Sequence, residues 1–161
     1  MNYSAGIIPF RFNPKSDKLE FFLGHPGGEY WEDKNYWAYL KGGVEEGENW
    51  LEAAKREFEE ESGISLVGID DKEFIPLGTA QQNPQKCVVA YGLEFTSESD
   101  GIDIDPSKCY SNMCEDNVTP EIDKYGWVDL ETTRRITHRA HLVFYDRIEQ
   151  WLINDTEFDR G

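Results

Sequence analysis

The sequence predicts a single α+β domain that spans residues 1–161. Short runs rich in β-branched and aromatic residues alternate with polar turns, as strands do. Two longer stretches, Asn49–Ser62 and Ala140–Ile153, instead carry apolar residues at helical spacing. The composition, 39% hydrophobic and 14% aromatic, suffices for a packed core and argues against disorder.

Six segments have the composition of strands. In chain order they are Ser4–Phe12, Leu19–His25, Trp37–Lys41, Glu73–Gln82, Lys86–Phe95 and Tyr125–Val128. The first two flank the polar turn NPKSDK, so we expect a hairpin or two neighbouring strands. Gly42, Gly43 and Gly47 mark a tight loop after the third. A long polar stretch, residues 96–124, precedes the last strand, and loops of this length commonly serve function.

The first predicted helix has a clear apolar stripe. Leu51, Ala54 and Phe58 recur at i, i+3 and i+7 and share one face. Gly63 stands where a glycine commonly ends a helix. The second predicted helix is amphipathic in the same way.

The end of the first helix, REFEEESGI, contains four glutamates. Glu57, Glu60 and Glu61 fall on one face at the rim of the apolar stripe, because residues three and four apart are neighbours on a helix. Carboxylate oxygens are ligands that suit Mg²⁺ or Mn²⁺, and a cation would turn their repulsion into attraction. Glu59 lies on another side and is expected to be solvated. The alternative is a solvated acidic helix face.

Arg56 is the nearest arginine to this face. A guanidinium can hold a carboxylate through two hydrogen bonds, so we expect Arg56 to orient Glu57 or Glu48. An incidental salt bridge is the alternative.

The formal net charge is −16, from 32 acidic and 16 basic residues. An acidic surface repels nucleic acid and anionic membranes. An anionic ligand would therefore need a local neutralising group, and divalent cations are natural candidates. The charge could also serve solubility alone.

The three cysteines, Cys87, Cys109 and Cys114, give an odd count without a zinc-type spacing. We expect reduced thiols, with a structural zinc site as the alternative. The first residues, MNYSAGIIPFRF, lack the features of a signal peptide, and no apolar run is long enough to span a membrane. The expected location is the cytoplasm.

The upstream loop gives the acidic helix a fixed context. Gly42 is followed by five residues and Glu48, then by seven residues and REFEEESGI. This arrangement resembles the box of the Nudix hydrolase family, G-x5-E-x7-R-E-U-x-E-E-x-G-U, where U is a bulky apolar residue, and every defined position from Gly42 to Ile64 matches. The resemblance implies the Nudix fold, an α/β/α sandwich with a mixed, curved sheet between helices.

The resemblance also implies an activity, the hydrolysis of a nucleoside diphosphate linked to another group, X, with Mg²⁺ or Mn²⁺ as cofactor. Glu57, which is also a candidate general base, lies at the first position of the acidic trio. By position, the metal ligands are Glu57, Glu60 and Glu61, the catalytic residues are Glu57, Arg56 and Glu60, and the structural positions are Gly42, Glu48 and Gly63.

A further glutamate lies in PEIDKYGW. Glu121, Tyr125 and Trp127 resemble an E-x3-Y-x-W arrangement of diadenosine-polyphosphate-type Nudix enzymes. The resemblance implies that Glu121 is a fourth metal ligand or the general base; a solvated loop acid is the alternative. The other acids of this loop are expected to be solvated: Glu98, Asp100, Asp103 and Asp105.

Four residues are candidates for substrate binding. Lys41 could contact a phosphate, and Tyr36, Trp37 and Tyr125 could stack on a nucleobase, although aromatic residues near a sheet often belong to the core. The histidines are expected to be packed or exposed and not catalytic: His25, His138 and His141.

The preferred substrate is a nucleoside or dinucleoside polyphosphate. A (d)NTP-sanitising enzyme, an RNA 5′-end pyrophosphohydrolase and a non-catalytic ligand-sensing module are the alternatives. We expect a small-molecule nucleotide as partner and no membrane, and the acidic charge disfavours nucleic acid. A monomer and a homodimer are both open.

Overall fold

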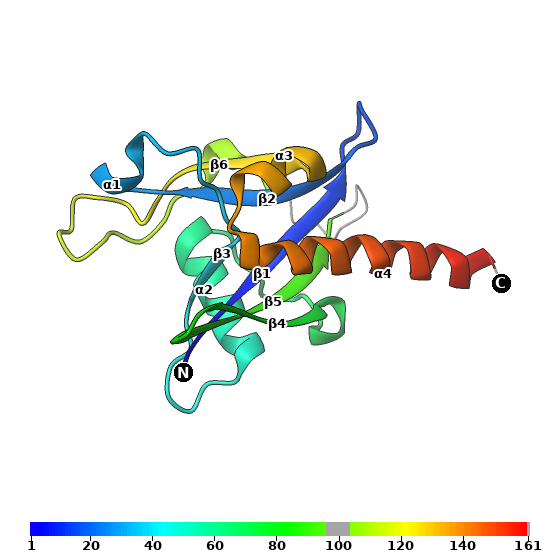
Figure 1. The fold of residues 1–161 in the computed structure, drawn as a ribbon, viewed down its shortest axis with the longest axis horizontal. Helices are drawn as coiled ribbons and strands as arrows, with labels where there is room; N and C mark the ends of the chain where they lie inside the picture. Colours follow the sequence, from blue (N-terminus) through cyan, green and yellow to red (C-terminus); the bar gives the residue numbers. More distant parts are fainter. Residues whose placement is uncertain (96–103, 161) are drawn as a thin grey trace.

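The computed structural model describes residues 1–95 and 104–160, with side chains placed as far as Asp155. The strands are β1 (Asn2–Phe12), β2 (Leu19–Pro26), β3 (Leu40–Gly43), β4 (Ile75–Asn83), β5 (Lys86–Glu94) and β6 (Ile122–Asp129). The helices are α1 (Glu29–Glu32), α2 (Trp50–Ser62), α3 (Leu130–Ile136) and α4 (Leu142–Arg160), with 3-10 turns at Asp71–Glu73, Pro106–Lys108 and Arg139–His141. Figure 1 shows their arrangement.

In the described part of the chain, the strands form one six-stranded sheet with the order β4-β5-β1-β2-β6, and β3 also pairs with β1. β1 and β5 are parallel, whereas the other pairs are antiparallel. The predicted mixed sheet and the predicted pairing of the first two strands are therefore confirmed. The predicted loop at Gly42 and Gly43 is wrong, because both glycines belong to β3 and pair with Ala5 and Ser4.

Along one of its edges, β1 pairs with two different strands in succession. The first half of β1, residues 4–7, pairs with β3, and its end, residues 10–12, pairs with β2. β2 then continues beside β6, and its backbone meets the segment that precedes β3 at an isolated bridge between Gly24 and Ala38. The sheet therefore opens between β2 and β3, and this opening becomes one side of the candidate site.

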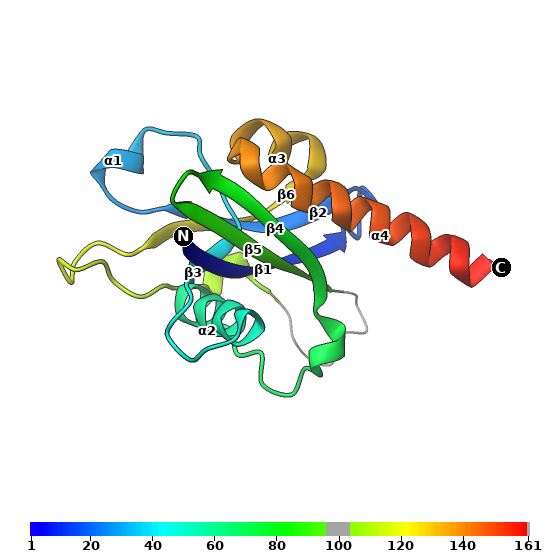
Figure 2. The same cartoon turned by 60° about the horizontal axis from the view of Figure 1, so that its bottom comes forward.

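Helices cover both faces of the sheet (Figure 2). Because successive strand residues face opposite sides, Ala5 and Ile7 of β1 lie in the core under α2, whereas Ile8 and Phe10 lie in the core under α4. The α/β/α sandwich implied by the sequence is confirmed. Within the described residues, none of the helices combines the length and the apolarity that crossing a membrane requires.

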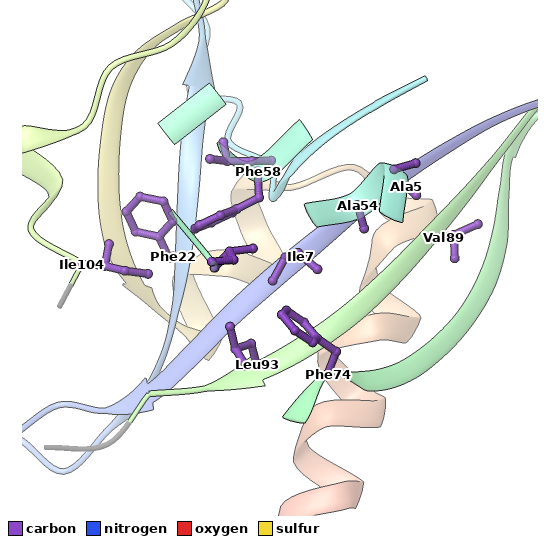
Figure 3. Close-up of a cluster of buried hydrophobic side chains, with 12 residues drawn as sticks. Ala5, Ile7, Phe22, Ala54, Phe58, Phe74, Val89, Leu93 and Ile104 are labelled. Carbon is purple, nitrogen blue, oxygen red and sulfur yellow. The ribbon is translucent and has the colours of Figure 1, made fainter. Parts of the chain in front are cut away.

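Helix α2 forms where the sequence predicts it. Asn49 caps its first turn through a reciprocal pair of hydrogen bonds with Glu52, and Gly63 ends it at a φ of 74°, in the left-handed region that favours glycine. Phe58 packs against Phe22 of β2, and this contact fixes the buried face of α2 (Figure 3). The glutamates are thereby held at the edge of the sheet.

Helix α3 is not predicted by the sequence analysis. Its two threonines have modest helix propensity, and it is only 7 residues long. Its start could have been recognised, because Asp129 accepts a hydrogen bond from the amide of Thr132, as a helix cap does.

Candidate active site

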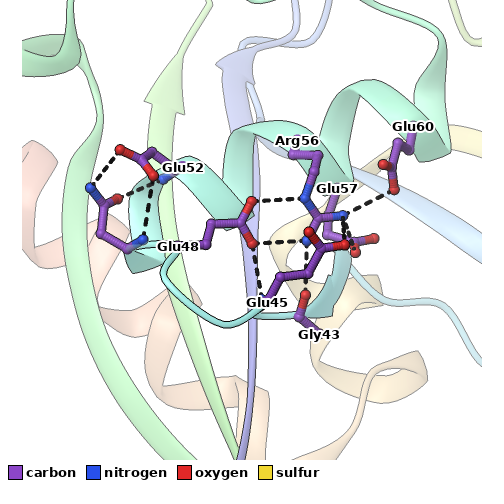
Figure 4. A network of polar contacts seen from close by, with 8 residues as sticks. Gly43, Glu45, Glu48, Glu52, Arg56, Glu57 and Glu60 are labelled. Atoms are coloured by element: carbon purple, nitrogen blue, oxygen red, sulfur yellow. Dashed lines mark hydrogen bonds and ion pairs between the residues drawn. The ribbon is translucent and has the colours of Figure 1, made fainter.

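Arg56 connects the loop before α2 to the acidic face of the helix (Figure 4). Its Nε donates to Oε2 of Glu48 at 2.8 Å and its Nη2 to Oε1 at 3.0 Å, a two-pronged pair that fixes the plane of the guanidinium. Nη2 also donates to the carbonyl of Gly43 at 2.9 Å. Nη1 donates to Glu57 at 2.9 Å and to Glu60 at 3.2 Å. Arg56 therefore contacts both of its predicted partners, Glu48 and Glu57, and Glu60 as well.

Gly42 makes room for the carboxylate of Glu57. A Cβ added to Gly42 would lie 2.1 Å from the carboxyl carbon of Glu57. Any side chain at this position would push the carboxylate away from β3, so the glycine allows the Glu57 carboxylate to lie against this strand.

Glu61 is the most buried of the carboxylates, with 7% of its surface exposed. Burial, and then the neighbouring charges of Glu57 and Glu121, raise its pKa to about 8, although Lys41 opposes the shift. Burial also raises the pKa of Glu57 and of Glu121, and Glu60 adds to both shifts. The neighbouring carboxylate charges thus oppose the ionisation of Glu57, Glu61 and Glu121, as in a group built around a cation when the cation is absent.

The segment after residue 104 returns to the end of α2 and caps it. The amides of Tyr110 and Asn112 donate to the carbonyls of Ser62 and Glu60, each at 3.1 Å. Glu121 follows on the same segment, where its amide donates to the carbonyl of Asn112 at 2.9 Å. These contacts bring Glu121 beside Glu60, although the two are far apart in sequence.

A metal ion fits the chemistry of this cluster. The donors are hard carboxylate oxygens, burial raises the pKa of three of the carboxyl groups, Glu57, Glu61 and Glu121, and the missing Cβ of Gly42 lets the Glu57 carboxylate lie against β3. Glu57 and Glu60 point toward Arg56, and no three potential ligands among the described residues converge on one point. Glu57, Glu60, Glu61 and Glu121 are the residues that could hold the ion.

A cleft of about 300 Å³ lies at the opening between β2 and β3. One wall is polar and is formed by Lys41, Gln82, Lys86 and His138. The rest of the lining is mainly apolar and includes Pro26, Trp31, Tyr36 and Ile122. Glu61 also lines the cleft, which therefore adjoins the acidic cluster.

The model of the NUDIX domain matches residues 5–148. The chain belongs to the NUDIX family. Members of this family cleave pyrophosphate linkages and generally use divalent metal ions. The "RNA pyrophosphohydrolase" of Pelagibacter ubique is 30% identical over 131 residues, which are 73% of this chain and 74% of that protein.

Solved NUDIX structures share the fold. The Ap4A hydrolase of C. elegans in a binary complex has a TM-score of 0.63 at 20% identity and covers 96% of this chain and 99% of its own. The NUDIX domain of Shewanella oneidensis NrtR complexed with ADP ribose has a TM-score of 0.62 at 11% identity, with 92% and 87% of the two chains covered.

Within this NUDIX fold, two of the four predicted substrate contacts line the cleft, Lys41 and Tyr36. Trp37 instead packs edge-on against His25, and Tyr125 stacks on Phe22 under α2. As substrate contacts, all four remain predictions.

The other predictions differ in outcome. Glu59 is not simply solvated, because its Oε2 accepts a hydrogen bond from the amide of Leu66 at 2.8 Å. Asp105 is half-buried and caps the short turn that follows it. His25 and His141 are buried, and His138 is half-buried. Glu98, Asp100 and Asp103 lie outside the described residues.

The sequence analysis did not select three polar residues that line the cleft: Gln82, Lys86 and His138. The turn NPQK could have indicated two of them, Gln82 and Lys86. It joins β4 to β5 and pairs Asn83 with Lys86, so the hairpin brings Gln82 near Lys86.

The raised carboxylate pKa values predict how the metal-free protein responds to pH. A carboxyl group whose pKa rises on folding holds a proton that the unfolded chain has already released, so the free energy of unfolding decreases as pH rises toward the folded pKa. For Glu61 this interval runs from about 4.3, the unfolded value, to about 8. Thermal unfolding in a chelator should give a falling Tm from pH 5 to 8. Glu61→Gln should flatten the curve; an unchanged slope would contradict the assignment.

Proposed function

We propose that this protein hydrolyses a pyrophosphate linkage in a nucleoside diphosphate linked to X, with Mg²⁺ or Mn²⁺ held by Glu57, Glu60, Glu61 and Glu121. The preferred substrate is a nucleoside or dinucleoside polyphosphate. The observation that carries the proposal is the group of mutually repelling carboxylates beside a cleft that has cationic and aromatic walls. The family membership supports it.

The residues of the site would have different roles in such a reaction. When bound, the divalent ions would neutralise the diphosphate and lower the pKa of a bound water. Glu57 is a candidate general base, because its burial raises its pKa toward the pH at which an enzyme works. Arg56 keeps the Glu57 carboxylate in place. Glu121 is the alternative base.

The cleft supports a small-molecule substrate. Trp31 and Tyr36 stack on each other at 4.8 Å between ring centroids and present an aromatic wall to a nucleobase. Lys41 lines the same cleft, interacts with the charge of Glu61, and is suited to a phosphate group. A cytoplasmic location remains a prediction, and both a monomer and a homodimer are compatible with the proposal.

A screen of nucleotides, sugar nucleotides and dinucleoside polyphosphates with Mg²⁺ tests this function. Product masses would identify the cleaved linkage. Release of AMP, inorganic pyrophosphate or a shorter nucleotide is the expected result, and it must disappear in a chelator. Tight nucleotide binding without turnover would instead support a ligand-sensing module.

A second candidate function is removal of pyrophosphate from the 5′ end of RNA. It is favoured by the 30% identity to a protein named RNA pyrophosphohydrolase and disfavoured by the net charge of −16. Triphosphorylated RNA assayed beside free nucleotides distinguishes the two. A higher kcat/KM for the RNA would move the assignment to this second function.

Glu121→Gln should lower kcat at least about tenfold, equivalent to about 1.4 kcal/mol of barrier. The amide keeps the shape of the side chain but removes the charge that acts on Glu61. The measurement is kcat at saturating Mg²⁺ on the best substrate from the screen. Glu115→Gln, at an exposed acid of the same segment, is the matched control. If Glu121→Gln lowered kcat no more than Glu115→Gln does, the role proposed for Glu121 would belong to another acid.

A further inference from the structure

The hydrogen bonds around His138 determine which of its ring nitrogens carries a proton. Nδ1 lies 3.0 Å from the amide of Ala140, which donates to it. Nδ1 must therefore be an acceptor, and the proton of the ring is on Nε2. Because His138 lines the cleft, it offers the cleft an N–H donor.

The orientation of Gln82 follows from its contact with His141. Nε2 of His141 lies 2.9 Å from Oε1 of Gln82, and Nδ1 of His141 is buried without a partner among the described residues. His141 is fully buried, and burial keeps it neutral by lowering its pKa to about 2. A buried N–H without a partner is rarer than a buried acceptor without one. The proton of His141 is therefore on Nε2 and is donated to Gln82.

This contact uses the oxygen of the Gln82 amide and leaves its NH2 group for the cleft that Gln82 lines. With Lys41 and Lys86, the polar wall then consists of four hydrogen-bond donors: two ammonium groups, an amide NH2 and an imidazole N–H. Neither lysine forms an ion pair with a carboxylate in the described part of the chain. Lys41 also interacts with the charge of Glu61, but two lysines that line one cleft without an ion-pair partner still favour the binding of an anion between them.

We propose that Lys41, Gln82, Lys86 and His138 form a binding site for a phosphate group of the substrate that lies beyond the diphosphate at the acidic cluster. The inference rests on the proposed function and specifies its substrate class. Glu61 lines the same cleft as this wall, so one polyphosphate chain can reach from the carboxylates to the donors. The site favours substrates with three or more phosphates over a diphosphate such as ADP-ribose, whose X carries no further phosphate.

His141 is a positioning residue in this scheme, because it acts only through the orientation of Gln82. Gln82→Glu is the sharpest variant. It keeps an oxygen for His141 but replaces the NH2 group with a second oxygen, which carries charge and repels an anion. Lys86→Met removes one cation from the same wall, and Lys86→Arg restores a cation.

Calorimetric titration of the metal-free protein with inorganic tripolyphosphate at low ionic strength tests the site without turnover. Gln82→Glu and Lys86→Met should each raise the Kd about tenfold or more, and Lys86→Arg should remain within about threefold of the wild type. Lys72→Met, which removes the same charge at an exposed position, is the control and should change the Kd less than about twofold. Absent wild-type binding, or equal weakening by Lys72→Met and Lys86→Met, would overturn the proposal.

Steady-state kinetics separate this inference from the proposed function. Lys86→Met should raise KM for diadenosine tetraphosphate about tenfold and leave KM for ADP-ribose within about twofold. Equal effects on both substrates would overturn the phosphate site while the hydrolase function stands. Binding of tripolyphosphate at this wall without hydrolysis of any nucleotide would overturn the function instead. If Gln82→Glu weakened binding of adenosine but not of tripolyphosphate, the wall would recognise a base, and the proposal would be wrong.

Discussion

Glu60→Gln and Glu61→Gln should each lower kcat by about 10³-fold, equivalent to about 4 kcal/mol of barrier. An amide oxygen carries no full charge and is a weaker ligand than a carboxylate for a hard divalent ion. The fold should survive, because the amide has the shape of the acid and each variant removes one of several like charges. The measurements are kcat with saturating Mg²⁺ and Tm in a chelator. Glu61→Gln should have a Tm equal to or higher than that of the wild type, whereas Glu60→Gln also loses its ion pair with Arg56 and should have a slightly lower Tm.

Glu46→Gln is the matched control for this pair. Glu46 lies in the loop before α2 and is exposed. It should retain wild-type turnover, because it removes the same charge away from the cluster. Near wild-type activity of Glu60→Gln or Glu61→Gln would refute the metal assignment.

After Glu60→Gln and Glu61→Gln, Arg56→Met should have the largest effect, and it should lower both stability and turnover. The variant leaves Glu48, Glu57 and Glu60 without the cation that holds them together. Because the Arg56 side chain is 25% exposed, water compensates part of the loss, and we expect about 2 kcal/mol less free energy of unfolding. Turnover should decrease about 10²-fold, since Glu57 is no longer held in place.

Arg56→Lys separates charge from geometry. An ammonium keeps the charge but cannot form the two-pronged contact with Glu48 while donating to Gly43 and Glu57. We expect most of the stability to return and most of the lost turnover to remain lost. Urea denaturation and kcat are the two measurements. Full recovery of kcat would reduce the role of Arg56 to charge alone.

The acidic helix was predictable because its information is local. The positions of Glu57, Glu60 and Glu61 on one face follow from the helical repeat, and the caps at Asn49 and Gly63 are adjacent to the helix that they delimit. Local chemistry of this kind can be recognised without knowledge of the fold.

The cleft was only partly predictable because its walls come from segments that are distant in sequence. Lys86 lies at the start of β5, His138 follows α3, and Trp31 belongs to α1. No repeat along the chain relates them. Tyr125 and Trp37 have the same aromatic character as Tyr36, and only the packing of the sheet determines which ring faces a core and which the cleft.

Lys41 and Gly42 are consecutive residues of β3 that have different structural roles. Lys41 lines the cleft, whereas Gly42 lies under the carboxylate of Glu57. Because side chains alternate along a strand, a shift of β3 by one residue against β1 that moves Lys41 to the place of Gly42 also moves Leu40 to the place of Lys41. The lysine would then intrude on the carboxylate, and a leucine would line the cleft in its place. We therefore expect the protein to tolerate changes of length in its surface loops far better than one residue inserted within β3, where the candidate substrate contact Lys41 and the position of the Glu57 carboxylate depend on the same strand register.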